Sequence, residues 1–370
     1  MSRRGTRAAL SMAMTAVVTL ASGPCAVAAA GGQAQDAAVS SQVVPGDPYP
    51  QRRIEFAQGV TGLPDLTYST VPGFRPLRLD LYLPPAKRRA GPSPFVIYVH
   101  GGGWQGGHTR QSGAFESWPK VLASLAARGY VVASIEYRLS GEARFPAAEQ
   151  DVKAAIRWMR SQASTYGIDR NHGLIWGASA GGQLAALAAT SCGVAALEPP
   201  PQERPGTGPT TDSNAAALES DCVQGAVTWY GVFDFSRLGA QSASGAAESR
   251  DRADPAAARY LGCQLTSCPR AVVEAASPIT YVDRSDPPML LIHGESDRTV
   301  PVRQSQEMYA RLRQTGVHAE LLVIPGVDHS FIGATPAATR AASRAALERV
   351  FTFIDATIGH QTPSSPGAGQ

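Results

Sequence analysis

Several features that would assign this chain to common protein classes are missing from its sequence. There is no run of Lys and Arg of the kind that binds nucleic acid, so we expect no nucleic-acid partner. The Cys and His residues lack paired metal-ligand spacings such as Cys-x-x-Cys, which argues against a zinc site. Internal repeats are absent, and we find no sign of a second domain. These absences leave a single globular domain as the expectation.

The sequence also lacks an apolar run long enough to indicate a membrane span. The apolar stretch Ala8–Ala21 follows three arginines and precedes small residues. This pattern predicts a signal peptide over residues 1–30, a linker over 31–50 and a secreted or periplasmic protein. A lipoprotein anchor at Cys25 and an uncleaved anchor helix are the alternatives. We expect no stable membrane insertion.

Charge gives little information about partners. Removal of the leader arginines lowers Lys plus Arg from 33 to 30, which equals the 30 Asp plus Glu, so the net charge falls close to zero. Hydrophobic residues make up 44% of the chain and charged residues 17%, a balance that allows a buried core to form. Nothing in the sequence indicates an oligomeric state.

Four cysteines remain after the leader, and an even number in an exported protein suggests two disulfides. Three pairings are possible. The short local loop favours Cys263–Cys268, which leaves Cys192–Cys222 as the second pair. That second bond would close an insertion at 193–221, which is rich in Pro, Gly and Thr. Free buried thiols are the alternative.

Hydrophobic periodicity predicts an alternation of strands and helices. The strands are expected at 77–83, 95–99, 130–136, 173–177, 225–231, 289–294 and 319–324. The helices are expected at 118–128, 147–164, 180–191, 303–315 and 337–357. This order predicts an α/β fold with a mostly parallel central sheet and helices on both faces. We place the domain at 51–360 and expect a disordered tail at 361–370.

Polar and glycine-rich segments follow four of the predicted strands. Active sites of open parallel sheets lie at the carboxyl ends of the strands, so these segments are expected to meet. Their convergence is more specific than any one motif alone. In chain order the segments carry the glycine loop His100–Trp104, then Ser179, then Asp297 and then His329.

The nucleophile is predicted from a short motif between a strand and a helix. Gly177-x-Ser179-x-Gly181 matches the nucleophile elbow, a sharp turn that exposes the serine hydroxyl. A helix N-cap serine is the alternative interpretation, and it is compatible with this position.

A serine hydroxyl needs an adjacent base, which an acid must orient. His329 follows the last predicted strand and is the predicted base. Asp297 is the predicted acid that holds the imidazole. Glu295 and Asp328 are the rival acids. Asp328 adjoins His329 in sequence, and neighbouring side chains rarely point at one another.

The glycine loop is expected to stabilise an oxyanion. Gly102 and Gly103 are predicted to offer backbone N–H groups, with the N–H of Ala180 as a third donor. A plain glycine turn is the alternative. His100 is expected to support the loop by hydrogen bonding. Trp104 is a candidate substrate-binding residue that walls the acyl pocket, with ordinary packing as the alternative.

From about Pro76 to Phe353 the chain resembles the α/β-hydrolases of the esterase and lipase type. It is similar to the hormone-sensitive-lipase-like esterases and, more closely, to the bacterial carboxylesterases that include feruloyl and acetyl-xylan esterases. Ala178, Glu136 and the insertion at 193–221 depart from the family pattern, which bears on the substrate class. The resemblance implies an α/β-hydrolase fold and a serine esterase without metal or cofactor. The matching motifs are HGGGW (100–104), EYRLS (136–140), FPAAEQDVKAAIRWMR (145–160), GASAGG (177–182), HGESDRTVP (293–301) and PGVDHSF (325–331).

Polar residues around Tyr137, Arg138 and 151–157 have a structural and a functional interpretation. They could position substrate. We expect instead a buried polar network that pins the helix at 147–164.

The expected function is that of an exported serine carboxylesterase, which hydrolyses small or carbohydrate-linked esters through an acyl-enzyme. One alternative is a serine peptidase of the prolyl-oligopeptidase kind, whose last segment resembles 289–331. Such enzymes usually carry a propeller domain and lack the HGGG loop. The other alternative is a non-catalytic binding protein of this fold, but such proteins usually lose members of the triad, which is complete here.

Overall fold

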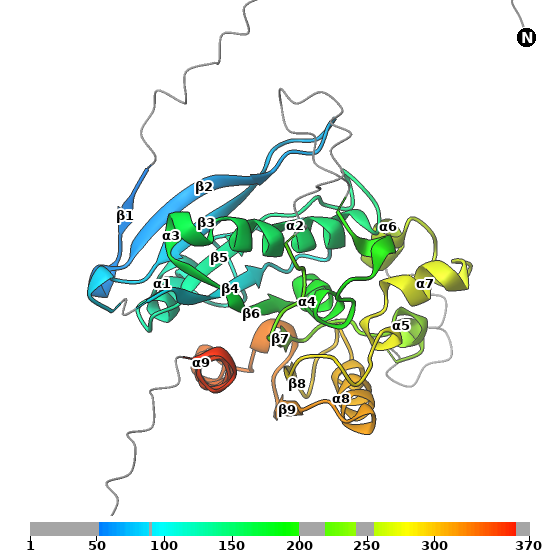
Figure 1. Cartoon of the computed structure of the whole chain (residues 1–370). Coiled ribbons are helices and arrows are strands. Elements are labelled where there is room, and N and C mark those ends of the chain that lie inside the picture. Colours follow the sequence, from blue (N-terminus) through cyan, green and yellow to red (C-terminus); the bar gives the residue numbers. More distant parts are fainter. Residues whose placement is uncertain (1–51, 89–90, 200–218, 242–254, 360–370) are drawn as a thin grey trace, which may run out of the picture. The chain divides into compact units, whose positions relative to one another are not determined.

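A nine-stranded sheet forms the centre of the described part of the chain (Figure 1). The expected leader at 1–30, linker at 31–50 and tail at 361–370 lie outside the described residues, as does most of the insertion at 193–221. All described residues belong to one unit, Gln51–Gln370. The computed structural model describes residues 52–88, 91–199, 219–241 and 255–359.

The strand order is β1-β2-β3-β5-β4-β6-β7-β8-β9. The first four strands in this order pair antiparallel, and every pairing from β5 to β9 is parallel. The predicted mostly parallel sheet is therefore confirmed. The strands are β1 (Ile54–Glu55), β2 (Thr61–Ser69), β3 (Leu77–Leu83), β4 (Ser93–Val99), β5 (Val131–Ile135), β6 (Ile168–Ala178), β7 (Gly225–Trp229), β8 (Met289–Gly294) and β9 (Ala319–Ile324).

The five predicted helices are present with small changes at their ends. The helix predicted at 147–164 ends earlier, at Ser161, because the backbone leaves the helical region at Gln162 before α3 begins. Within the described ranges no helix is long and apolar enough to cross a membrane. The α-helices are α1 (Trp118–Ala126), α2 (Ala147–Ser161), α3 (Ala163–Tyr166), α4 (Ala180–Thr190), α5 (Phe235–Gln241), α6 (Pro255–Leu261), α7 (Arg270–Ala276), α8 (Arg303–Thr315) and α9 (Pro336–Ile358).

The sheet is covered on both faces, which explains why the inner strands β4, β5 and β8 are largely apolar runs. In β4, Phe95, Ile97 and Val99 pack on one face with residues of α2, α4 and α8. Val96 and Tyr98 point to the opposite face, where α1 and α9 lie. Figure 1 shows α2 and α4 on one side of the strands and α9 on the other. Successive side chains of a strand point to opposite faces of the sheet, so each strand contributes to the apolar core on both faces.

Buried ion pairs hold α2 in place. The guanidinium of Arg138 donates to both carboxylate oxygens of Asp151 at 2.8–3.0 Å, and its backbone N–H donates to the same carboxylate at 2.8 Å. Two residues after Asp151 in the same helix is Lys153, which is fully buried and pairs with Asp221. Removing one partner of such a pair leaves an uncompensated buried charge. These contacts confirm the predicted buried polar network that pins this helix.

Both predicted disulfides are formed. Cys192 is bonded to Cys222, and Cys263 is bonded to Cys268. The first bond joins the segment after α4 to the segment before β7. Asp221, which pairs with Lys153, directly precedes Cys222, so the disulfide and the ion pair fix the same stretch of backbone.

Glu149 is a buried carboxyl group without a hydrogen-bond partner among the described residues. It lies in the first turn of α2. Burial raises the pKa of Glu149 to about 8, although the nearby Lys153 cation opposes this shift. The side chain is therefore neutral in the folded protein at pH 7. In an unfolded chain a glutamate has a pKa of about 4.3 and is ionised at that pH.

This difference predicts a pH-dependent loss of stability. Between about pH 4.3 and 8 the folded state keeps a proton that the unfolded state releases, so the free energy of unfolding decreases as pH rises. The steepest contribution of one group is about 1.4 kcal/mol per pH unit. Glu149→Gln should remove this contribution and unfold at a higher urea concentration than wild type at pH 8. The control Glu116→Gln alters an exposed carboxyl. Parallel pH curves for wild type and Glu149→Gln would contradict the assignment.

Candidate active site

The carboxyl ends of the parallel strands bring the predicted site residues to one edge of the sheet. The glycine loop follows β4, and Ser179 lies between β6 and α4. Asp297 follows β8, and His329 begins a 3₁₀ turn after β9. These four strands are joined through parallel pairings along the order β4-β6-β7-β8-β9. Their loops therefore meet although the residues are far apart in sequence.

Ser179 occupies a strained turn that only glycine neighbours allow. Its backbone has φ 55° and ψ −119°, an uncommon conformation for a residue other than glycine. A Cβ atom on Gly177 would lie 1.9 Å from the carbonyl oxygen of Gly181. A Cβ atom on Gly181 would lie 2.2 Å from the carbonyl oxygen of Val99. The two glycines of the motif are thus required by backbone contacts on either side of the serine.

The imidazole of His329 lies between Ser179 and Asp297. Its Nδ1 is 2.7 Å from Oδ2 of Asp297, and its Nε2 is 3.0 Å from Oγ of Ser179. An ionised carboxylate can only accept, so Nδ1 carries the donated hydrogen and Nε2 accepts from the serine hydroxyl. The ring of Tyr230 packs edge-on against His329 with centroids 4.6 Å apart. The three predicted residues therefore form one continuous hydrogen-bonded chain.

Asp297 is kept ionised by its surroundings. Burial alone would raise its pKa, but hydrogen bonds from His293 and His329 hold the pKa of this carboxyl well below its ordinary value. Oδ1 accepts the backbone N–H groups of Thr299 and Val300 at 2.9 and 2.8 Å. Oδ2 faces both histidine rings. All the bonds to this carboxylate therefore favour its charged form.

The two rival acids have other partners. Asp328 pairs with Arg298 and accepts the backbone N–H of His329 at 2.7 Å, so it contacts the main chain of that residue. Glu295 accepts the backbone N–H of Gly326 at 3.4 Å. The carboxylate that the structure brings to the imidazole is that of Asp297.

The glycine loop packs directly against the turn that carries the serine. A Cβ atom on Gly101 would lie 2.8 Å from the carbonyl oxygen of Ala178 and 3.1 Å from Cβ of Ser179. Gly102 has φ +118°, and a Cβ there would lie 2.3 Å from the carbonyl oxygen of Gly106. The loop therefore brings its backbone closer to Ser179 than any larger residue would permit.

His100 and Trp104 flank the loop as buried supports. His100 donates from Nδ1 to the carbonyl oxygen of Gly101 at 2.7 Å and stacks on Tyr137. Burial lowers the pKa of His100 to about 4, so this ring is neutral at pH 7. Trp104 is only 3% exposed and stacks on Tyr260 with centroids 4.6 Å apart. Packing accounts for most of the surface of Trp104, and its contact with substrate stays a prediction.

Sequence reasoning missed two residues that support the site. His293 is fully buried and contacts Oδ2 of Asp297 at 3.2 Å, while Tyr230 packs on His329. Each lies at the end of an apolar strand, His293 within β8 and Tyr230 just after β7. A polar or aromatic residue in that position was the available signal. The direction in which such a side chain points could not be predicted from the sequence, because it depends on the register between strands.

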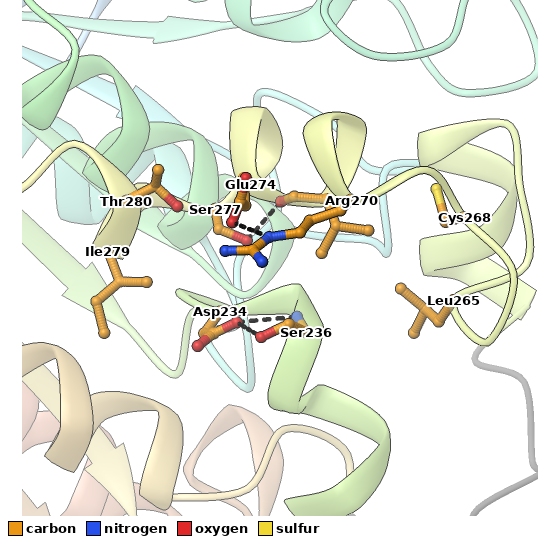
Figure 2. Close-up of a pocket in the computed structure, with 10 residues that line it drawn as sticks. Asp234, Ser236, Leu265, Cys268, Arg270, Glu274, Ser277, Ile279 and Thr280 are labelled. Atoms are coloured by element: carbon orange, nitrogen blue, oxygen red, sulfur yellow. Dashed lines mark hydrogen bonds and ion pairs between the residues drawn. The ribbon is translucent and has the colours of Figure 1, made fainter.

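A separate cavity of about 450 Å³ lies beside α5 and α7. Figure 2 shows Arg270 paired with Glu274 on one side and Asp234 bonded to Ser236 on the other. Ser179, Asp297 and His329 are not among the residues that line it. Those residues are Asp234, Ser236, Leu265, Cys268, Arg270, Val273, Glu274, Ser277, Ile279 and Thr280.

One group of potential metal ligands occurs among the described residues, and its chemistry does not suit a metal. It consists of Cys192, Asp221 and Cys222. Both sulfur atoms are joined in the disulfide, and metal binding requires the thiolate. The carboxylate of Asp221 is paired with Lys153.

The known proteins to which this chain is similar include several esterases. The BD-FAE family matches residues 79–312, a range that contains Ser179 and Asp297 and ends before His329. Esterase LipC of Mycobacterium tuberculosis is 34% identical over 65% of this chain and 53% of its own length. Ethyl acetate hydrolase of Pseudomonas putida is 30% identical over 72% of this chain and 75% of its own length. The chain thus spans about half the length of LipC, and less than two thirds of two other esterases of that organism.

Solved structures show the same fold. A truncated carbohydrate esterase from gut microbiota superposes with a TM-score of 0.60 at 26% identity, over 81% of this chain and 96% of that one. Together with the sheet order, this similarity confirms the predicted α/β-hydrolase fold.

The glycine loop offers a matched test of the packing. Gly102→Ala places a Cβ against a carbonyl oxygen at a positive φ, whereas Gly106→Ala meets no described atom within 4 Å. Gly102→Ala should lower the free energy of unfolding by about 2 kcal/mol or more, because strained backbone and steric overlap add. Gly106→Ala should change it by less than about 1 kcal/mol. Urea unfolding measures both, and equal effects would refute the close approach at Gly102.

Proposed function

The chain belongs to the BD-FAE family, and we propose that it is a serine carboxylesterase in which Ser179, His329 and Asp297 form the catalytic triad. The observation that carries the proposal is the position of His329, within hydrogen-bond reach of both the serine hydroxyl and the aspartate. Such a chain of contacts lets a base activate a weak nucleophile. The esterase names of the relatives support the same reaction class.

In the first step Oγ of Ser179 attacks the carbonyl carbon of the ester. The new C–O bond forms as the hydroxyl proton passes to Nε2 of His329, and the carbonyl electron pair moves to oxygen. Asp297 stabilises the imidazolium without taking its proton. Collapse of the tetrahedral intermediate breaks the bond to the leaving alcohol, which receives the proton from Nε2. The acyl group then remains on Ser179.

In the second step water is the attacking group and Ser179 is the leaving group. His329 removes a proton from water, whose oxygen attacks the acyl carbon. The bond to Oγ of Ser179 then breaks, and the serine recovers the proton from Nε2. The products are one carboxylic acid and one alcohol, so the overall reaction consumes one water and needs neither an oxidant nor a metal.

We place the oxyanion against backbone N–H groups of Gly102, Gly103 and Ala180. Ala180 begins α4 directly after the nucleophile, and the loop backbone packs on the same turn. Fixed donors of this kind stabilise charge that develops only in the transition state. The N-terminal end of α4 adds a favourable helix dipole.

Small esters and esters attached to carbohydrates are the proposed substrates. One relative carries the name ethyl acetate hydrolase, and one structural neighbour is described as a carbohydrate esterase. Both descriptions suit the mechanism, because the alcohol leaves after protonation by His329 whatever its size. The acyl group is the part that the glycine loop must accommodate.

We propose that the protein acts outside the cytoplasm. Two disulfides occur within the described residues, and such bonds persist in oxidising compartments. The pattern of residues 1–30 supports export through a cleaved leader.

The first test is hydrolysis by protein that begins at Gly31. Wild type should cleave p-nitrophenyl acetate, p-nitrophenyl butyrate, methyl ferulate or acetylated xylan, and the relative rates rank the acyl and alcohol sites. Ser179→Ala should lower kcat by at least about 10⁴-fold, since the nucleophile is lost. Equal rates for wild type and Ser179→Ala would refute the serine mechanism. Cleavage of peptidyl-proline amides alone would favour a peptidase, and inertness on every substrate would favour a binding protein.

A second test separates the proposed acid from its neighbour. Asp297→Asn should lower kcat by about 10⁴-fold with little change in KM, because the amide favours the wrong imidazole tautomer. Asp328→Asn keeps an oxygen that can accept the backbone N–H of His329. We expect it to change kcat by less than about 10-fold, since its carboxylate does not orient the ring. The reverse order of effects would show that Asp328 is the acid.

A further inference from the structure

Gln183 connects three elements around the site. It lies in α4, one helical turn after the nucleophile, and is fully buried. Its backbone N–H donates to the carbonyl oxygen of Ser179 at 3.0 Å. Its side chain accepts the indole N–H of Trp104 at 2.9 Å and donates to the carbonyl oxygen of Ala276 at 2.9 Å. One residue therefore joins the nucleophile turn, the glycine loop and the end of α7.

The side-chain amide matches these partners without ambiguity. An indole N–H can only donate and a peptide carbonyl can only accept, so the oxygen of Gln183 must face Trp104 and the nitrogen must face Ala276. An apolar residue of similar size would leave the indole N–H and the carbonyl unpaired in the interior. Such unpaired groups cost free energy, so the local structure would shift to satisfy them.

The hydrogen bond from Trp104 to Gln183 can affect the glycine loop because Trp104 is part of that loop. Trp104 directly follows Gly103 and has φ 56°, a strained value for a residue with a side chain. Its side chain bonds to Gln183, stacks on Tyr260 and packs on Phe235. Its carbonyl oxygen accepts the backbone N–H of Ser140 at 2.7 Å. The bond to Gln183 is the one among these that runs to the helix behind the nucleophile.

We propose that Gln183 is a positioning residue, which sets the distance and angle between the glycine loop and the nucleophile turn. This inference rests on the proposed esterase function. The two groups of proposed oxyanion donors lie on different elements, Gly102 and Gly103 on the loop and Ala180 on α4. Gln183 bonds to the loop through Trp104 and to the nucleophile through the helix backbone, so it keeps both sets of donors directed at one oxygen.

The expected consequence falls on kcat. Oxyanion contacts form in the transition state, so a displaced loop lowers kcat and leaves KM nearly unchanged. Loss of one complete donor costs about 100- to 1000-fold in kcat. A loop that is loosened but keeps its donors should lose part of this stabilisation of the transition state. We therefore expect Gln183→Met to lower kcat by about 10-fold or more.

The control variant is Thr190→Val. Thr190 is buried in the same helix, and its hydroxyl shares its one hydrogen between the carbonyl oxygens of Ala186 at 3.0 Å and Pro278 at 3.2 Å. Its removal disturbs packing between α4 and the segment after α7 without touching Trp104. Both variants are assayed for kcat and KM on p-nitrophenyl acetate, and their melting temperatures are compared. Gln183→Met should lose kcat far beyond Thr190→Val, including at temperatures where both are fully folded.

A double-mutant cycle tests whether the effect passes through the indole N–H. Trp104→Phe removes the donor and keeps an aromatic ring. If Gln183 acts through this bond, Gln183→Met combined with Trp104→Phe should lose little more than the larger single change. Additive losses in kcat would overturn the proposal. If Gln183→Met fails to fold, Trp104→Phe alone must lower kcat with little change in KM, and an unchanged kcat there would overturn it.

Wild type and Ser179→Ala distinguish this inference from the proposed function. An inactive wild type, or an active Ser179→Ala, refutes the esterase mechanism and the role of Gln183 with it. An active wild type and an inactive Ser179→Ala uphold the mechanism. In that case a folded Gln183→Met with wild-type kcat refutes the positioning role alone.

Discussion

Direct contact between backbone segments is the constraint on which the site depends. The turn at Ser179 can form only because Gly177 and Gly181 lack side chains, which lets the end of β6 and the start of α4 touch. The same absence at Gly101 brings the glycine loop against the serine. A single added Cβ at any of these three positions would overlap a carbonyl oxygen. The strain at the serine is thus maintained by packing on all sides, as is typical of functional turns.

Charge at the site is organised around Asp297. A buried carboxylate is costly unless several donors face it, and here two backbone N–H groups and two histidines do so. Its ionised state fixes the hydrogen on Nδ1 of His329 and leaves Nε2 to accept from the serine. His293 takes part in this balance from inside β8. Glu149 has the opposite environment, since it has no partner among the described residues, and burial keeps it neutral at pH 7.

Local patterns predicted much of the architecture. Continuous apolar runs identified β4, β6 and β8 because both faces of the sheet are buried, and α2 was recognised from its 3.6-residue periodicity. The short helices α5, α6 and α7 were not predicted, because seven residues hold too few turns for a periodicity to be recognised. The strand β2 was missed as well. It contains a glycine and a proline and pairs with β3 through an irregular register, so its apolar pattern is interrupted.

The sequence by itself determined which segments meet at the site, and it offered Asp297 as the acid with Glu295 and Asp328 as rivals. Ser179, Asp297 and His329 each follow a strand, and strand ends in a parallel sheet lie at one edge whatever the details of packing. Only the tertiary structure decided which carboxylate reaches the imidazole and how Gln183 contacts Trp104. Those contacts depend on register, on side-chain direction and on the space left between elements, and none of these is encoded in a local pattern of residues.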